Sequence, residues 1–252
     1  IPELKGLVYK TSYHDVSPFR RMLVKIKKEI VSLRRGDLDT QNNTGKYLSP
    51  LDFQDLMEQD NKDFVLVDTR NDYEFSMGSF EGAVNPNISK FAEFPEWLDA
   101  NLSSNKDKKI ITFCTGGIRC EKATVFMKNQ GYSDVYQLEG GILSYLEFMK
   151  SSSRESKWQG ECTVFDKRLA LKGDLEASSR KICFVCLQSI SLSDETATYS
   201  AGVACSKCNL HMKKHQKIRS EKALSRRQEN ARKRRENCKK NRSKYMSSLN
   251  EE

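Results

Sequence analysis

Residues 109–123 of this 252-residue chain read KIITFCTGGIRCEKA. A short apolar run leads into Cys114, which is followed by a glycine-rich turn and then by a helical pattern. The unpaired N–H groups of the turn and the positive end of the helix dipole would face the sulfur and favour thiolate over thiol. Arg119 adds a fixed positive charge nearby. We interpret Cys114 as a reactive cysteine; the alternative is a buried free cysteine at a strand end.

The sequence around this segment alternates between strand and helix patterns. Strands are predicted at 64–68, 110–113 and 134–138, and helices at 49–58, 119–130 and 141–149. Ser49 is suited to cap the first helix, with Pro50 at its first position. The alternation predicts an α/β domain with a parallel sheet and flanking helices. Functional loops of such sheets lie at the carboxyl ends of the strands, and Cys114 directly follows one of them.

The cysteine loop resembles the active-site loop of rhodanese-like domains, in which a cysteine and the following residues hold a sulfur atom as a persulfide. The resemblance implies Cys114 and Arg119 as catalytic residues, and it assigns to the active-site loop Thr115, Gly116, Gly117, Ile118 and Cys120. Cysteine phosphatases have a related loop with one more residue between cysteine and arginine. The shorter spacing here favours a sulfur atom or a small substituent on the cysteine over a phosphate.

The segment 64–75 also matches a rhodanese pattern, in which an aspartate, an arginine and a glutamate form a structural charge network. The resemblance assigns these roles to Asp68, Arg70 and Glu74. In the next matching segment, residues 79–80 are Ser-Phe, where family members often carry histidine and isoleucine. A later strand delivers a glycine pair beside the active-site loop, and the resemblance spans about residues 46–150.

Composition limits the class of protein. Hydrophobic residues make up 37% and charged residues 31% of the chain, so we expect part of it to be extended or solvated. No signal peptide and no apolar run long enough to span a bilayer is visible, which predicts a cytoplasmic protein without membrane contact. Eight cysteines, arranged as a catalytic thiol plus metal-type pairs, fit a reducing compartment. The chain starts at Ile1, so we expect its first domain to be incomplete.

Four parts are predicted along the chain. They are the end of an α+β unit with a linker (1–45), the rhodanese-like domain (46–150), a cysteine-rich subdomain (151–210) and a basic tail (211–252). Within the first part, residues 21–31 alternate apolar and basic side chains, the pattern of a half-buried strand with a face that carries Lys and Arg.

The cysteine-rich subdomain contains two C-x-x-C pairs with 18 residues between them, formed by Cys183, Cys186, Cys205 and Cys208. This spacing fits a four-cysteine structural zinc site, because each pair can close a tight turn around a tetrahedral ion. The alternative is four unmetallated thiols in a subdomain held by packing. Cys162 and Cys238 are unassigned, with the active-site region as one place for Cys162 and an incidental role for Cys238.

The tail from His211 to Glu252 carries 15 Lys/Arg and 5 Asp/Glu, a net charge of +10, whereas the whole chain is +9. It contains neither proline nor glycine, so it can be helical, yet it has almost no apolar stripe. The two interpretations are a solvated extension and a clamp for the phosphate backbone of a nucleic acid.

Further motifs narrow the resemblance to the rhodanese-like tRNA uridine-34 hydroxylases of bacteria. They stand at 28–31, 69–74, 85–87, 94–95, 114–123, 140–142, 160–162 and 164–166. The resemblance implies oxygen-dependent conversion of the wobble uridine of tRNA to 5-hydroxyuridine, with molecular oxygen as co-substrate and the tRNA anticodon loop, rather than DNA, as partner. It also implies that an acylphosphatase-like (ferredoxin-like) α+β domain precedes the rhodanese domain. No flavin, haem or iron-ligand motif is visible, so neither an electron donor nor an oligomeric state is assigned.

A mechanism follows as a hypothesis. The Cys114 thiolate, or a persulfide on it, adds to C6 of uracil and raises the electron density at C5, where oxygen reacts. Cys120 either resolves an oxidised Cys114 or contributes only to packing, while Lys25, Lys27, Lys28 and the basic tail hold phosphates. Two other functions stay open: a sulfurtransferase that passes persulfide sulfur to a small acceptor or to RNA, and a non-catalytic RNA-binding adaptor.

Overall fold

The computed structural model describes residues 24–179 except Asp37 and Lys167, together with 181–183, 189–190 and the single residues Gly6, Phe19, Cys205, Cys208, Ser225 and Glu229. The chain divides into two compact units, residues 1–178 and 179–252. Almost all of the predicted basic tail, most of 1–23 and the cysteines Cys186 and Cys238 lie outside the described residues. The predicted division at residues 45, 150 and 210 therefore stays a prediction.

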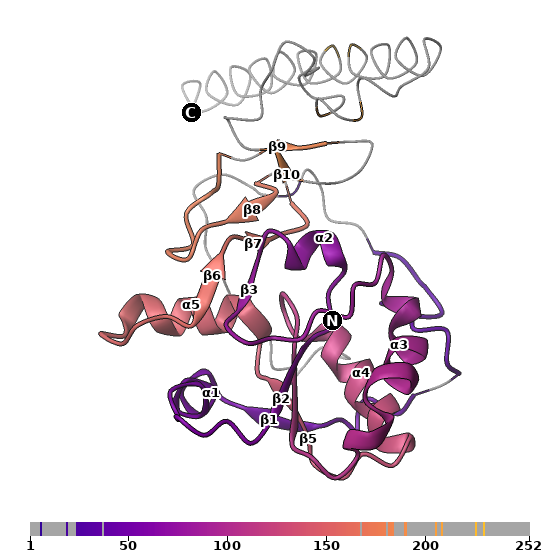
Figure 1. Cartoon of the computed structure of the whole chain (residues 1–252). Helices are drawn as coiled ribbons and strands as arrows, with labels where there is room; N and C mark the ends of the chain where they lie inside the picture. Colours follow the sequence, from indigo (N-terminus) through magenta and orange to yellow (C-terminus); the bar gives the residue numbers. More distant parts are fainter. Residues whose placement is uncertain are drawn as a thin grey trace. The chain divides into compact units, whose positions relative to one another are not determined.

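A four-stranded parallel sheet forms the centre of the first unit (Figure 1). Its strands lie in the order β1 (Lys46–Leu48), β5 (Val135–Leu138), β4 (Ile110–Phe113) and β2 (Val65–Asp68). The register pairs Val65 with Ile110 and Ile110 with Val135. The prediction of a parallel α/β sheet is confirmed, and the three predicted strands are β2, β4 and β5.

Helices cover both faces of the sheet (Figure 1). The elements are α1 (Pro50–Met57) and α5 (Gly141–Ser151) on one face, and α3 (Phe94–Asn101) and α4 (Ile118–Asn129) on the other. Successive strand residues point to opposite faces, so Leu66 and Ile111 pack with α1 and α5, whereas Val67 and Ile110 pack with α3 and α4. The α1 helix begins as predicted: the Ser49 hydroxyl accepts the Asp52 N–H at 3.1 Å, and Pro50 follows it.

Shorter elements complete the described structure. They are α2 (Asp72–Phe75), β3 (Gly78–Phe80), 3₁₀ turns at Phe91–Glu93 and Ser103–Asn105, β6 (Trp158–Gly160), β7 (Cys162–Thr163) and β8 (Ala170–Leu171). In the second unit, β9 (Lys181–Ile182) pairs antiparallel with β10 (Ser189–Ile190). Antiparallel pairing of β3 with β6 forms a separate two-stranded sheet, which connects residues 158–160 to the segment after α2.

The Ser-Phe pair that departs from the rhodanese pattern has a packing role. Phe80 is 3% exposed, and its ring makes edge contacts, at centroid distances of 4.8–5.1 Å, with four aromatic rings: Phe53, Phe113, Tyr145 and Trp158. The Ser79 hydroxyl donates to Asp68 Oδ2 at 3.2 Å. An aromatic cluster of this kind stabilises the core beyond the apolar area that it buries.

The half-buried strand predicted at 21–31 is wrong for its described part. Residues 24–31 form no strand, and Val24, Ile26 and Ile30 are 83%, 103% and 80% exposed. Alternation produces a strand only where a neighbouring strand accepts its hydrogen bonds, and among the described residues none pairs with this segment.

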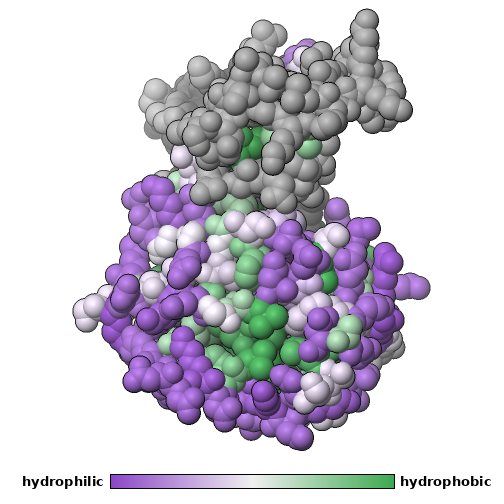
Figure 2. Space-filling model, viewed as in Figure 1, coloured by the Kyte–Doolittle hydropathy of each residue, from purple (hydrophilic) through white to green (hydrophobic). Residues whose placement is uncertain are grey.

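Figure 2 shows an apolar area on an otherwise hydrophilic face of the unit. Within the described part of the chain, no helix is long and apolar enough to cross a membrane.

Candidate active site

Cys114 lies where the end of β4 meets the start of α4, at the carboxyl edge of the sheet. The loop turns at Gly117, whose φ of 91° is a left-handed conformation that favours glycine. This conformation directs the Gly117 N–H at the sulfur, to which it donates at 3.1 Å. The structure therefore has the loop geometry that the sequence predicted, with a backbone donor on the Cys114 sulfur.

A second glycine pair places the start of α5 in hydrogen-bond contact with the cysteine loop. After β5, Gly140 and Gly141 have φ values of 66° and 65°, and the turn brings the start of α5 against the cysteine loop. The Ile142 N–H donates to the Cys114 carbonyl at 2.9 Å, and the Leu143 N–H donates to the Thr115 carbonyl at 3.1 Å. The loop is thus hydrogen-bonded to a rigid helix start.

Substituting Gly141 by alanine is expected to damage the loop. An added Cβ would lie 2.3 Å from the Cys114 carbonyl oxygen, and the positive φ adds strain. We expect the free energy of unfolding to fall by about 2 kcal/mol or more. Gly116→Ala is the matched control, because its Cβ would meet nothing within 4 Å. Urea denaturation of both variants measures the difference, and equal stabilities would contradict the close packing described.

The surroundings of Cys114 favour its thiolate. A hydrogen bond from the Cys120 thiol, the charge of Arg119 and the backbone N–H groups of both residues together outweigh burial and lower the pKa of Cys114 to about 6. Burial, followed by the hydrogen bond and charge of Cys114, raises the pKa of Cys120 well above its usual value. At neutral pH the pair therefore consists of an anionic Cys114 and a neutral Cys120 that donates to it.

The Arg119 guanidinium is held by a buried carboxylate. Arg119 Nη1 and Nη2 donate to the two oxygens of Glu74 at 2.6 and 2.8 Å. Glu74 is fully buried, and it also accepts the Asn71 N–H at 3.0 Å. This two-point pairing fixes the orientation of the cation beside the sulfur.

Asp68 and Arg70 form a separate buried pair. Arg70 Nε donates to Asp68 Oδ1 at 2.9 Å, and Arg70 Nη2 donates to Asp68 Oδ2 at 2.6 Å and to the Gly78 carbonyl at 2.6 Å. The charge network predicted for Asp68, Arg70 and Glu74 is thus arranged as two ion pairs, and the second includes the proposed catalytic arginine.

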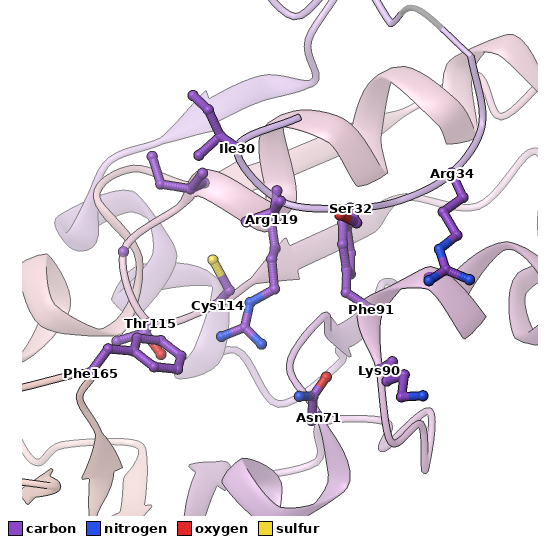
Figure 3. A pocket seen from close by; sticks show the side chains of 14 residues that line it. Ile30, Ser32, Arg34, Asn71, Lys90, Phe91, Cys114, Thr115, Arg119 and Phe165 are labelled. Carbon is purple, nitrogen blue, oxygen red and sulfur yellow. The ribbon is translucent and has the colours of Figure 1, made fainter. Parts of the chain in front are cut away.

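A cavity of about 640 Å³ opens at Cys114 (Figure 3). In that view Cys114 lies between the ring of Phe165 and the side chain of Arg34. The lining residues come from the loop, from the chain before the sheet, from the segment after β2, from the Phe91 turn and from the β7–β8 connection. They are Ile30, Val31, Ser32, Arg34, Asn71, Lys90, Phe91, Ala92, Cys114, Thr115, Gly116, Ile118, Arg119 and Phe165. None of the described lining residues is an acid, and Arg34 and Lys90 add positive charge beside the Arg119–Glu74 pair.

The strap formed by residues 30–34 was not predicted as part of the site. Leu33 is 1% exposed and fastens the strap to the core, and Lys122 Nζ donates to the Val31 carbonyl at 3.0 Å. Arg34 has a φ of 58°, a left-handed conformation that is rare outside glycine. The available signal was the apolar group Ile30, Val31 and Leu33, of which the strand interpretation of 21–31 used only the first two residues.

Cys162 is not among the residues that line the cavity, but it lies near the charged groups of the site. It is fully buried in β7 and packs in the core, where burial raises its pKa to about 12 although the charge of Arg70 lowers it. The thiol is therefore neutral, and a place for it in the active-site region stays a prediction.

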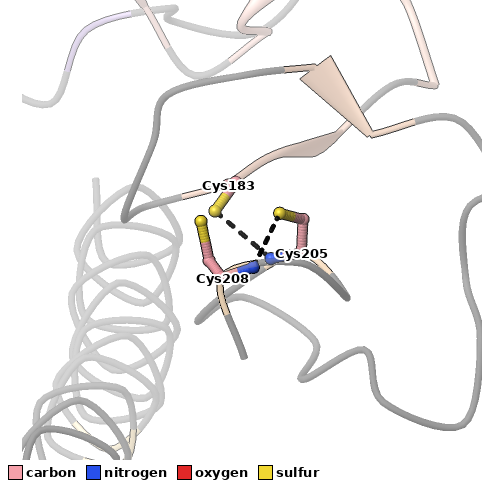
Figure 4. A group of neighbouring side chains, drawn as sticks. All are labelled: Cys183, Cys205 and Cys208. Atoms are coloured by element: carbon pink, nitrogen blue, oxygen red, sulfur yellow. Dashed lines mark hydrogen bonds between the residues drawn. The ribbon is translucent and has the colours of Figure 1, made fainter. Parts of the chain in front are cut away.

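Three of the four predicted metal ligands come together in the second unit (Figure 4). The sulfur atoms of Cys183, Cys205 and Cys208 all lie within 4.8 Å of one another. The Cys205 N–H donates to Cys183 Sγ at 3.2 Å, and the Cys208 N–H donates to Cys205 Sγ at 3.5 Å. The fourth predicted ligand, Cys186, lies outside the described residues. A cluster of thiols with backbone N–H donors could bind a metal ion.

Three kinds of comparison show which known proteins this chain is similar to. A family model described as rhodanese-like domain matches residues 49–147. The tRNA uridine(34) hydroxylase of Picosynechococcus sp. is 45% identical over 229 residues, which are 90% of this chain and 76% of that protein. Among solved structures, the Alr3790 protein of Anabaena sp. is 16% identical with a TM-score of 0.38, covering 45% of this chain and 91% of its own. A rhodanese-like domain protein of Staphylococcus aureus is 25% identical with a TM-score of 0.34, and the match covers 40% of this chain and 90% of that protein.

Proposed function

The chain belongs to the tRNA uridine(34) hydroxylase family, and from this premise we propose that it uses the Cys114 thiolate to convert the wobble uridine of tRNA to 5-hydroxyuridine with molecular oxygen. The observation that carries the proposal is a low-pKa thiol at the base of a cavity without acidic side chains. Such a thiol is a nucleophile at neutral pH, and the cavity is large enough for a nucleobase.

The chemistry that we propose begins at C6 of the uracil ring. C6 is electrophilic because it is conjugated with the C4 carbonyl, and addition of the Cys114 sulfur there moves electron density to C5. Addition of C5 to molecular oxygen gives a C5 hydroperoxide. An external two-electron donor such as a pair of thiols then supplies two electrons and two protons, which break the O–O bond, leave a hydroxyl on C5 and release water. Departure of the thiolate from C6 with loss of the C5 proton restores the ring. Arg119 and the Gly117 N–H stabilise the sulfur anion before addition and after departure.

The cations around the cavity suit an RNA strand. Arg34 and Lys90 line it beside Arg119, and the exposed side chains of Lys25 and Lys27 lie a few residues before the strap. Positive side chains of this kind bind backbone phosphates without reading sequence. A wobble base stands in the unpaired anticodon loop, so extruding it into the cavity costs less than it would in a duplex.

Hydroxylation and sulfur transfer predict different products from the same thiol. Purified chain, a tRNA with an unmodified wobble uridine, air and a reductant are expected to give a nucleoside with one added oxygen atom. Mass spectrometry after labelling with heavy oxygen gas identifies the source of that atom. Rapid thiosulfate-to-cyanide transfer without a modified nucleoside would instead support the sulfurtransferase, and neither reaction would support the binding adaptor.

For the second unit we propose a structural zinc ion held by Cys183, Cys186, Cys205 and Cys208. Thiolates bound to one zinc ion stand about 3.8 Å apart, given a Zn–S bond of about 2.3 Å, and the three described sulfurs are already close to this spacing. Zinc would cross-link this unit and would take no part in the reaction. The tRNA substrate and the reduced thiols of Cys114, Cys120 and Cys162 favour a reducing cytoplasm.

Removing this metal is expected to unfold the second unit. We expect elemental analysis to find about one zinc ion per native chain and less zinc in the Cys205→Ser variant. A strong chelator should release the zinc, and residues 179–252 should then lose their resistance to protease. Cys162→Ser is the matched control, since that cysteine lies in β7 of the first unit. Native chain that contains no metal and whose cysteines 183, 205 and 208 all react freely with a thiol reagent would contradict the site.

A further inference from the structure

We propose that Phe165 is the stacking platform for the base that enters the cavity, an inference that rests on the proposed function. Phe165 lines the cavity together with Cys114, yet its side chain is 70% exposed. Its ring lies beside the active-site loop, with the Arg119 guanidinium carbon 5.9 Å from the ring centroid (Figure 3). A large apolar ring that is left in water at the edge of a cavity has an unused face for a ligand.

The chain around Phe165 is held in place, so the exposure of the ring is built into the fold. The Val164 N–H donates to the Leu169 carbonyl at 2.9 Å. On the other side, the Asp166 carboxylate accepts the Arg168 N–H at 2.8 Å and the Arg168 Nε at 3.0 Å. These bonds close a turn on both sides of the ring and hold it outside the core.

The turn is also connected to the reactive loop. The Thr115 hydroxyl donates to the Thr163 carbonyl at 3.5 Å, which links the residue after the nucleophile to the strand that precedes Phe165. The other aromatic residue of the cavity, Phe91, is 7% exposed and stacks on Phe94 at 5.9 Å, so its ring is part of the core. Phe165 is therefore the aromatic side chain, among the described lining residues, with a free face.

Stacking suits the chemistry of the site. Proteins that bind unpaired nucleotides commonly place an aromatic ring against the base, since every base has a flat π face. A base that stacks on Phe165 would be fixed in a plane close to the sulfur. This would orient C6 for addition, while the phosphates stay near Arg34 and Lys90.

A double-mutant cycle between protein and RNA tests this contact. The binding partners are Cys114→Ser protein, with or without Phe165→Leu, and an anticodon stem-loop that carries either uridine or an abasic nucleotide at the wobble position. We expect each single change to weaken binding by roughly tenfold to a hundredfold and the second change to add almost nothing. If the two changes together weaken binding by the product of their separate effects, the proposal is overturned, because Phe165 then does not contact the wobble base.

Two controls separate stacking from structural damage. Phe165→Trp keeps an aromatic face and should bind the uridine stem-loop like the native chain, whereas Leu51→Ala removes an exposed apolar side chain outside the cavity and should change nothing. Because the Phe165 side chain is 70% exposed, Phe165→Leu should unfold in urea at nearly the same midpoint as the native chain. A clearly lower midpoint, or equal weakening of binding by Phe165→Trp and Phe165→Leu, would reject the stacking role.

The cycle does not depend on catalysis. If the chain stacks the wobble base but gives no 5-hydroxyuridine, the platform stands and the proposed reaction fails. If the chain hydroxylates uridine but the effects of Phe165→Leu and of the abasic nucleotide on binding multiply, the proposed reaction is supported and the stacking role of Phe165 is rejected.

Discussion

Replacing Cys114 with alanine is expected to abolish formation of 5-hydroxyuridine, with turnover reduced by at least about a thousandfold. The substitution removes the atom that adds to C6, and no other described residue of the cavity carries a thiol. Binding of tRNA should persist, because Arg34, Lys90 and Phe165 are unchanged. The measurement is single-turnover hydroxylation at saturating tRNA, followed by nucleoside mass spectrometry.

Cys120→Ala is the matched control for that experiment. Cys120 is buried, and its pKa is raised well above the usual value, so it is a poor nucleophile and its role in this account is to donate a hydrogen bond. We expect Cys120→Ala to raise the pKa of Cys114 and to lower turnover by about tenfold. Equal inactivation of both variants would instead favour Cys120 as a resolving thiol, and full activity of Cys114→Ala would contradict the mechanism.

Glu74→Gln is expected to cost about 3–5 kcal/mol of unfolding free energy, because it leaves the buried Arg119 guanidinium without its counter-charge. Burial tends to raise the pKa of Glu74, but the hydrogen bonds and charge of Arg119 outweigh it and lower that pKa overall. A carboxyl group whose pKa is lower in the folded than in the unfolded chain stabilises the fold at pH values above its unfolded-state pKa. This stabilisation is lost as the pH falls through the folded-state pKa. Native chain should therefore lose more stability on acidification than Glu74→Gln.

The surface ion pair between Arg35 and Glu96 provides the control. Their side chains are 40% and 65% exposed, so Glu96→Gln should change stability little. Urea denaturation followed by tryptophan fluorescence is suitable, because the two tryptophans, Trp97 and Trp158, both lie in the first unit. A similar small loss for both variants would show that the Glu74–Arg119 pair does not carry the stability assigned to it.

Much of the fold could be predicted because the central strands are continuous apolar runs. β2, β4 and β5 are buried on both faces, and such runs are typical of parallel strands. β1 was missed because it is an edge strand, and its residues Lys46 and Tyr47 are exposed, so no apolar run marks it. The alternation at 21–31 was misinterpreted because amphipathic alternation forms a strand only beside a pairing partner, and none of the described strands pairs with residues 24–31.

The candidate site was predictable where its residues are close in sequence. The spacing of Cys114 and Arg119 and the glycines between them define the loop without reference to the rest of the chain. The Glu74–Arg119 pair joins residues 45 positions apart, and only the fold brings them together. Arg34 and Phe165 contribute from outside the sheet domain, and their surroundings in sequence carry no periodic signal.

The account depends on an ionised Cys114, and the pH dependence of its alkylation tests this most directly. Native chain treated briefly with iodoacetamide across a pH series, and analysed for the peptide that contains Cys114, should show a half-maximal rate near pH 6. Arg119→Met should move the midpoint upward, because it removes a charge that favours the thiolate. A midpoint near about 8.5, the value of a free cysteine, in both proteins would contradict the central claim.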